Sequence, residues 1–295
     1  MISLKIFFSL FLFFYSFSWC QDFRYQLSIA AVFQNEAPYL KEWIEFHRLC
    51  GVEHFVLFNN NSDDYYREVL LPYVEEGFVE VFELPSKVYE DDLSNFIYNV
   101  QLKAYNTAIS LMRGVSKWLA LIDVDEYIVV VKDFNILNCL ENRFPLVSGL
   151  NINWQCYGTS GIEILDSSKP MIAQLLYKMP PHDPLNRNCK CIVKPLEVKE
   201  CHSPHFCKYI KGCRGVDVKF RLCNGYSKTI EIDTIRINHY WTKDEWFLKN
   251  IKVPRYIKWG VNSIESLEKA NKMNQEYDNI VENFLSTIHG FKTAS

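Results

Sequence analysis

The feature that most constrains the fold is an alternation of short apolar runs with helical patterns between residues 25 and 131. Runs at residues 27–33, 54–58, 78–82 and 118–122 have the length and apolar content of buried strands. The segments between them carry apolar residues at helical spacing, and strands joined through helices form parallel sheets with helices on both faces. We therefore predict an α/β fold with a mainly parallel sheet flanked by helices.

Polar residues follow three of these runs. In a parallel sheet, ligands bind beside the carboxyl ends of the strands. Residues 33–36, 59–64 and 123–126 come directly after such ends, so we expect them to lie along one rim and to form the ligand site. The chain from about residue 151 onward is less periodic and predicts short strands and loops, with two amphipathic helical stretches between residues 243 and 288.

Asp123 and Asp125 are two carboxylates, one residue apart, at the end of a uniformly apolar strand. A divalent cation with oxygen ligands would compensate their charge and would also create a binding position for diphosphate oxygens. The alternative is a pair of acids that cap the next turn. The metal interpretation requires that both side chains face a cavity and are not buried in ion pairs with lysine or arginine.

The second rim segment is rich in turn-forming polar residues. Asn60, Asn61 and Asp64 offer groups that could hydrogen-bond a nucleobase and ribose, although a polar turn followed by a helix cap is a slightly better explanation of this segment. His202, His205 and His239 lie in segments that could fold over the metal and supply a nitrogen ligand; the alternative is a structural, hydrogen-bonded histidine.

The first 20 residues differ from the rest of the chain. Residues 6–17 contain only apolar residues, serine and tyrosine, and Ser18 and Cys20 follow as small residues before a cleavage point. We expect a signal peptide at residues 1–20, or an uncleaved anchor over residues 2–19 that would attach the protein to a membrane; a lipoprotein signal is a third option. The expected location is therefore the secretory route or a membrane.

Six of the ten cysteines fall in one 35-residue stretch, from Cys189 to Cys223. Their spacing does not match the usual paired pattern of a zinc site. With an export signal we expect one or two disulfides, whereas in a reducing compartment they would be buried thiols. The formal net charge of −3 gives no overall field that would gather nucleic acid, and we expect no nucleic-acid partner.

Several blocks of the sequence resemble glycosyltransferase family 92 and its family-2-like relatives. They occur in the order expected for that family and run from about residue 27 to residue 258. The blocks are Phe33-Gln34-Asn35-Glu36 with residues 39–47, 51–55 and 59–64; residues 118–128 around Asp123 and Asp125; Asn153-Trp154 with residues 158–161; residues 190–195 with His202; and residues 238–246 around His239.

The resemblance implies a Rossmann-like GT-A fold, a UDP-hexose donor that is often UDP-galactose, Mn²⁺ or Mg²⁺ as cofactor, and transfer to a glycan acceptor with inversion. It places Asp123 and Asp125 at the metal, with His202 and His239 in loops closing over the donor. The donor-binding residues would be Asn35, Glu36, Asn60, Asn61, Asp64, Asp123 and Trp154. This chain departs from the family in having Asn59 or Asn60 where an acid often stands.

The domain prediction that follows has three parts. Residues 25–260 form the transferase domain, with a nucleotide-sugar half at 25–131 and an acceptor half at 150–260, and residues 261–295 form a C-terminal helical segment. An inverting transfer also needs a base. Glu163, Asp166 and Asp183 are candidates, and we favour Asp183, which lies in a proline-rich loop at residues 180–184, ahead of Glu163; a turn residue is the alternative.

Two other functions compete with a glycosyltransferase. A carbohydrate-binding protein could keep the fold without turnover, but the presence of both Asp123 and Asp125 argues against it. A nucleotidyltransferase would use the same metal and diphosphate geometry. It would normally carry a glycine- and lysine-rich phosphate loop after the first strand, and residues 33–38 contain neither glycine nor lysine.

Overall fold

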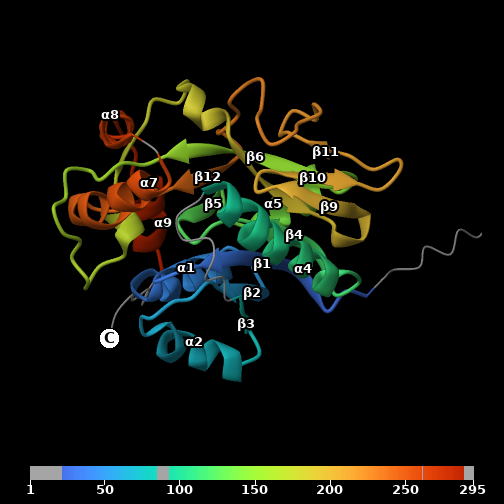
Figure 1. Ribbon diagram of the computed structural model, residues 1–295. Coiled ribbons are helices and arrows are strands. Elements are labelled where there is room, and N and C mark those ends of the chain that lie inside the picture. Colours follow the sequence, from blue (N-terminus) through green and yellow to red (C-terminus); the bar gives the residue numbers. More distant parts are fainter. Residues whose placement is uncertain (1–21, 85–92, 261, 289–295) are drawn as a thin grey trace, which may run out of the picture.

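The computed structural model of the chain describes residues 22–84, 93–260 and 262–288. One central sheet runs through the molecule and helices cover its faces (Figure 1). The signal peptide or anchor predicted for residues 1–20 lies outside the described residues. Within the described part of the chain, no helix has the length and apolar character needed to cross a bilayer.

The first half of the chain forms the parallel part of the sheet. Its four strands pair in the order β3-β2-β1-β4, and every pairing among them is parallel. This confirms the α/β class and the parallel arrangement predicted from the apolar runs. The elements are β1 (Tyr25–Phe33), α1 (Ala37–Leu49), β2 (His54–Asn59), α2 (Tyr66–Glu75), β3 (Val79–Glu83), α4 (Leu102–Met112) and β4 (Ser116–Leu121).

Strand β1 is apolar throughout because both of its faces are buried. Alternate residues along a strand point to opposite faces. Leu27 and Ile29 pack in the core on the side of α1, together with Trp43, whereas Ala30 packs in a second core that includes Ala104 of α4. A strand covered by helices on both sides therefore shows a continuous apolar run in place of an alternating one.

Beyond β4 the sheet becomes mixed. It continues in the order β4-β8-β6-β12-β5, with antiparallel pairings of β8 to both neighbours and of β5 to β12, and a parallel pairing of β6 with β12. The short strand β11 also pairs with β6. These strands are β5 (Glu126–Val130), β6 (Gly149–Cys156), β8 (Cys189–Val193), β11 (Gly215–Val216) and β12 (Ile235–His239).

The remaining elements are short. Two small antiparallel pairs, β9 with β10 and β7 with β13, lie outside the main sheet. Helix α5 follows β5, and 3-10 turns η2, η3 and η4 lie in the loops. Their bounds are α5 (Ile136–Arg143), η2 (Met171–Ala173), β7 (Tyr177–Lys178), η3 (Pro184–Arg187), η4 (Pro195–Glu197), β9 (Val198–Ser203), β10 (Phe206–Tyr209) and β13 (Glu276–Tyr277).

Two helical regions of the described chain contain a π-helical segment. The first comprises α3 (Leu93–Asn95), the π-helical segment η1 (Phe96–Gln101) and α4. The second comprises α6 (Glu245–Phe247), the π-helical segment η5 (Leu248–Lys252), α7 (Val253–Lys258), α8 (Ser263–Asn271) and α9 (Ile280–Ser286). The arrowhead of β6 points to the end of the molecule where α7 and α8 gather (Figure 1).

The nine described cysteines are all free thiols, and eight of them are buried. The disulfides expected for an exported protein are therefore not formed, and the structure has the alternative arrangement of buried thiols. The sulfur atoms of Cys189 and Cys223, for example, are 4.0 Å apart. A disulfide bond is about 2.0 Å long, so these two sulfurs are not bonded.

Candidate active site

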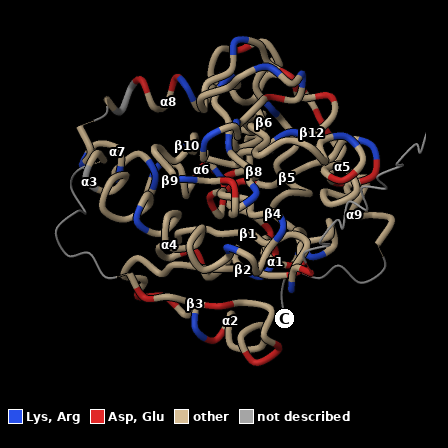
Figure 2. The backbone as a smooth tube through the Cα atoms, turned by 90° about the vertical axis from the view of Figure 1, so that its right-hand side faces the viewer, with Lys and Arg blue, Asp and Glu red and all other residues tan. Residues whose placement is uncertain are grey.

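The candidate site lies where the strand order reverses. β1 and β4 are neighbours at the centre of the sheet, and β2 and β3 extend to one side of β1 while β8 and β6 extend beyond β4. Ligands of open α/β sheets bind at such a switch point, beside the carboxyl ends of the strands. Asp123 and Asp125 follow β4 at this point, and an acidic stretch lies near the middle of the molecule beside β8 and β5 (Figure 2).

Asp123 is held from three sides by donors within the chain. Its Oδ1 accepts hydrogen bonds from Gln101 Nε2 at 2.7 Å and Tyr105 OH at 3.0 Å, and its Oδ2 accepts one from Lys190 Nζ at 2.9 Å. Burial by itself would raise the pKa of Asp123, but the ammonium of Lys190 outweighs it and the pKa is lowered. Asp123 is therefore an ionised carboxylate whose two oxygens already have partners.

Lys190 connects Asp123 to a second acid. Its side chain is only 1% exposed, and its Nζ lies 3.5 Å from Glu126 Oε2. The same oxygen of Glu126 accepts a hydrogen bond from the backbone N–H of Asp123 at 2.9 Å. Complete burial and the nearby aspartates raise the pKa of Glu126 despite Lys190. This group of three side chains fixes the turn that presents Asp125.

Asp125 faces a lysine and a histidine. Its Oδ2 accepts a hydrogen bond from Lys252 Nζ at 3.1 Å, and its Oδ1 lies 3.4 Å from His239 Nε2. Burial would raise the pKa of Asp125, but Lys252 and His239 hold it well below its ordinary value. Both aspartates are thus paired with lysine, and the expectation that neither would be buried in such an ion pair is wrong. A cation could therefore bind Asp125 only if the ammonium of Lys252 moved away from this carboxylate.

Three buried polar atoms around this turn have no hydrogen-bond partner among the described residues: Glu126 Oε1, Trp154 Nε1 and His239 Nδ1. The ring of Trp154 lies between two histidines, with centroids 4.4 Å from His239 and 5.3 Å from His205. Burial lowers the pKa of His205 to about 4, so this imidazole is neutral at physiological pH. The histidine that reaches the site beside Trp154 is His205, whereas the sequence favoured His202.

The geometry at Asp125 and His239 fits a divalent cation. Two ligands about 2.1 Å from one cation, at about 90–110° to each other, are about 3.0–3.4 Å apart, and Asp125 Oδ1 and His239 Nε2 are 3.4 Å apart. Carboxylate and imidazole groups are common ligands of such ions. Asp123 fits less well because its oxygens are engaged, and the described residues contain no ready group of three or more ligating side chains.

Glu36 also pairs with a lysine. Its Oε2 accepts a hydrogen bond from Lys243 Nζ, and the side chain of Lys243 is 1% exposed. The ammonium also lies over the rings of Tyr39, at 3.6 Å from the centroid, and Phe247, at 4.2 Å. The predicted nucleotide contact of Glu36 would have to use its remaining oxygen.

The two rim loops are joined to each other by hydrogen bonds. The N–H of Asn35 donates to Ser62 Oγ at 2.9 Å, and Asn35 Oδ1 accepts from the N–H of Asp63 at 2.9 Å. Asp64 Oδ2 accepts from the N–H of Ala37, the first residue of α1. Asp64 thus provides the acceptor for the first N–H group of α1. Asn60 and Asn61 precede Ser62 in the same loop, so five of the predicted donor-binding residues lie in two adjacent loops: Asn35, Glu36, Asn60, Asn61 and Asp64.

The predicted catalytic acids lie farther along the chain. Asp183 is half-buried and caps η3, where it accepts a hydrogen bond from Leu185 N–H at 2.9 Å. Glu163 is 71% exposed, 3.7 Å from Lys249, and Asp166 is exposed and bonded to Ser168. His202 is exposed on β9 with its ring against Phe206, so the structure does not bring it to the cluster around Asp125.

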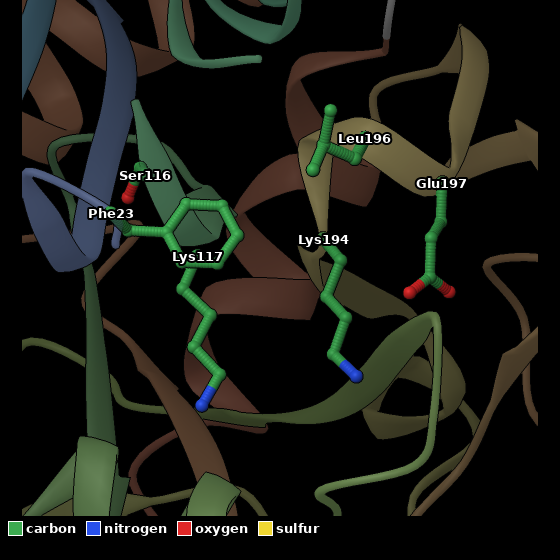
Figure 3. Close-up of a pocket in the computed structure, with 6 residues that line it drawn as sticks. All are labelled: Phe23, Ser116, Lys117, Lys194, Leu196 and Glu197. Carbon is green, nitrogen blue, oxygen red and sulfur yellow. The ribbon is translucent and has the colours of Figure 1, made fainter. Parts of the chain in front are cut away.

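A pocket of about 210 Å³ lies elsewhere, at the other end of β4. Its walls come from the residues that precede β1, open β4 and follow β8: Phe23, Ser116, Lys117, Lys194, Leu196 and Glu197 (Figure 3). Ser116 begins β4 and the site residues follow its last residue. We give this pocket no part in the chemistry because it lies at the amino ends of the strands, whereas ligands of such sheets bind at the carboxyl ends.

Sequence reasoning did not single out the three lysines of the site. Lys190 carried a signal, because a lysine inside the otherwise apolar strand β8 must be buried and therefore compensated by an acid. Lys243 and Lys252 carried none, since lysines next to amphipathic helices are usually exposed. Gln101, which donates to Asp123, could not be recognised as a site residue either, because it lies within a helical pattern.

Comparison with known proteins gives consistent results. The sequence model of glycosyltransferase family 92 matches residues 24–290. A glycosyltransferase family 92 protein of Ricinus communis is 23% identical over 177 residues, which cover 58% of this chain and 29% of the relative. Galactan beta-1,4-galactosyltransferase GALS2 of Arabidopsis thaliana is 27% identical over 161 residues, which cover 53% of this chain and 27% of the relative. The chain thus matches less than a third of the length of these relatives.

Among solved structures, TarS of S. aureus overlaps with 90% of this chain and 44% of its own, at 11% sequence identity and a TM-score of 0.43. A similarity of that degree supports no conclusion about this chain. The match to the family model over residues 24–290 is the finding that bears on identity.

Proposed function

Because the chain belongs to glycosyltransferase family 92, we propose that it is a metal-dependent glycosyltransferase. It moves a hexose from a UDP-sugar to a hydroxyl group of a glycan or other acceptor, with inversion at the transferred carbon. Galactose is the first candidate for the sugar, because GALS2, which this chain resembles over part of its length, is a galactosyltransferase. The observation that carries the proposal is the 3.4 Å approach of His239 Nε2 to Asp125 Oδ1 at the switch point of the sheet.

The charges of the site agree with a diphosphate that arrives together with a divalent cation. The ion pairs join four carboxylates, those of Glu36, Asp123, Asp125 and Glu126, with three lysine ammonium groups, those of Lys190, Lys243 and Lys252. A doubly charged diphosphate and a divalent cation leave this balance unchanged. The diphosphate alone would add uncompensated negative charge to a buried site, which is costly.

The chain's own residues then have distinct roles. Asp125 and His239 would hold Mn²⁺ or Mg²⁺, and when bound this ion would offset the negative charge that develops on the departing nucleoside diphosphate. The ion pair of Lys190 with Asp123 fixes the turn that follows β4, so that Asp125 is held in position before the donor binds. Trp154, which packs on His239, offers an indole N–H and an apolar ring to the sugar.

Inversion requires attack from the face opposite the leaving group. The acceptor oxygen forms a bond to the sugar carbon while the bond from that carbon to the diphosphate breaks, and a base takes the hydroxyl proton. We assign the base to Asp183, because Glu163 and Asp166 are exposed. The hydrogen bond from Leu185 N–H engages Oδ1 of Asp183 and leaves Oδ2 for the proton.

The test is a screen of UDP-sugars with the purified full chain, in the presence of Mn²⁺ and in the presence of EDTA. We expect metal-dependent transfer or hydrolysis with at least one UDP-hexose, and its loss in Asp125→Asn. The matched control is Asp233→Asn, because Asp233 is an exposed acid just before β12, at the end of this strand opposite His239; this variant should keep wild-type turnover.

Other results of the same screen would identify the competing functions. Tight binding of a sugar without turnover would indicate a carbohydrate-binding protein, and release of pyrophosphate would indicate a nucleotidyltransferase. Equal turnover in EDTA and in Mn²⁺ would refute the metal-dependent mechanism.

A further inference from the structure

The three lysines of the site differ in how firmly they are held. Lys190 and Lys243 are each 1% exposed; Lys190 contacts two carboxylates, and Lys243 contacts one carboxylate and two aromatic rings. Lys252 is 12% exposed, and Asp125 is its one carboxylate partner within the described parts of the chain. Of the three, Lys252 is therefore the ammonium group that can leave its carboxylate at least cost.

Lys252 compensates the same carboxylate that a cation would use, Asp125. Its Nζ lies 3.1 Å from Oδ2, while His239 approaches the other oxygen of the same carboxylate. A divalent ion held by Asp125 and His239 would repel an ammonium so close to it. The ammonium and the divalent ion therefore compete for one carboxylate.

The local backbone also marks Lys252. It is the last residue of the π-helical segment η5, and Gln101, which donates to Asp123, is the last residue of the π-helical segment η1. π-Helical turns are rare, and they occur frequently at functional sites. The two segments are linked, because the ring of Phe96 in η1 stacks on Trp259 after α7, with centroids 5.8 Å apart.

The ammonium of Lys252 also lies over an aromatic ring. The ring centroid of Trp241 is 5.6 Å from Lys252 Nζ and 5.2 Å from Lys269 Nζ. A long lysine side chain can turn about its own bonds without moving the helix. Lys252 can thus leave Asp125 and remain beside the site, where an incoming diphosphate would give it a new anionic partner.

We propose that Lys252 is an internal counter-ion that pairs with Asp125 in the ligand-free protein and transfers to the donor's diphosphate when a divalent ion binds Asp125 and His239. This inference rests on the proposed function, because it takes the diphosphate of a nucleotide-sugar as the new partner. Lys252 then lowers the affinity for the metal and raises the affinity for the nucleotide. The metal alone binds more weakly because Lys252 competes, and the nucleotide binds more tightly because Lys252 contacts it.

The experiment measures two affinities for the full chain. Binding of Mn²⁺ alone is followed by the loss of the free-ion signal in electron paramagnetic resonance, and binding of UDP at saturating Mn²⁺ is followed by titration calorimetry. In Lys252→Met we expect Mn²⁺ alone to bind about tenfold more tightly and UDP to bind about tenfold more weakly, the ratio that corresponds to one hydrogen bond of a charged group.

Two further variants control the result. Lys249→Met removes a lysine of the same segment that is 52% exposed and paired with Glu245, and both affinities should stay at wild-type values. Lys252→Arg keeps the positive charge, so this variant should bind Mn²⁺ as weakly as the wild type does. This comparison remains informative if Lys252→Met does not fold.

Each remaining outcome has a separate meaning. Unchanged or weaker Mn²⁺ binding in Lys252→Met, or unchanged UDP binding, would overturn the role of Lys252 and leave the proposed function standing. Failure of the wild-type chain to bind UDP with Mn²⁺ would overturn the proposed function, and this inference with it.

Discussion

Replacing Lys190 with methionine should lower the free energy of unfolding by about 3–5 kcal/mol, the usual cost of removing one partner from a buried ion pair. The lysine ammonium is 1% exposed and lies 2.9 Å from Asp123 Oδ2 and 3.5 Å from Glu126 Oε2. Methionine keeps much of the side-chain volume, so packing changes little. The two carboxylates, however, lose the cation that compensates them.

The size of this effect should depend on pH. Lys190 lowers the pKa of both Asp123 and Glu126, so its removal raises both pKa values. A carboxyl group whose pKa is higher in the folded state than in the unfolded state stabilises the fold at low pH, and this stabilisation is lost as the pH rises through the folded-state pKa. The difference between wild type and variant should therefore be smaller near about pH 5 than near about pH 8.

Urea denaturation followed by tryptophan fluorescence at both pH values measures this difference. The control is Lys208→Met, which removes a lysine from an exposed pair with Glu200 whose side chains are 43% and 45% exposed, and it should cost less than about 1 kcal/mol at either pH. A loss below about 1 kcal/mol in Lys190→Met, or an equal loss at both pH values, would refute the view that Lys190 is the compensating charge of this turn.

Three other predictions test separate parts of the structure. Asp64→Ala removes the acceptor for the N–H of Ala37 and should lower stability by about 1 kcal/mol in thermal unfolding, whereas Asp63→Ala should change it by less than about 0.5 kcal/mol. Asp183→Asn should lower kcat by about 10²–10⁴-fold and leave the KM for the donor unchanged, whereas loss of similar size in Glu163→Gln would transfer the assignment of base to Glu163. Iodoacetamide should label Cys213 in the native protein and leave buried thiols such as Cys139 unlabelled, because burial raises the pKa of Cys139 to about 11. If the protein is denatured without a reductant and then labelled, its intact mass would reveal any disulfide, because the two bonded cysteines would carry no label.

The parallel half of the sheet could be predicted because burial on both faces leaves a direct mark in the sequence. The run at residues 27–33 is apolar at every position but one, and it became β1 (Tyr25–Phe33). Its single polar residue, Ser28, is buried and donates to Ser116 Oγ of β4. The mixed half was harder, because β8 and β12 are short and their pairing partners are distant in sequence.

The π-helical turns could not be predicted. The apolar spacing of residues 93–113 fits an ordinary α-helix, and a π turn inserts one extra residue without changing composition. Its consequence for the site is large, because η1 and η5 end at Gln101 and Lys252, the residues that contact Asp123 and Asp125.

The choice between His202 and His205 also depended on structure that the sequence does not reveal. His202 lies on β9, whereas His205 lies in the turn that joins β9 to β10. The alternation of side chains along a strand therefore does not predict the direction of His205. His205 packs on Trp154 and its Nδ1–H donates a hydrogen bond to Cys189 O, 2.8 Å away, while His202 is exposed.

The most direct test of the central claim is the position of manganese in crystals of the full chain grown with UDP and Mn²⁺. We predict one anomalous difference peak within about 2.3 Å of both Asp125 Oδ1 and His239 Nε2, with the diphosphate of UDP on its open side and Lys252 turned away from Asp125. A peak elsewhere, or bound UDP with Lys252 still on Asp125 and no manganese between Asp125 and His239, would contradict the account.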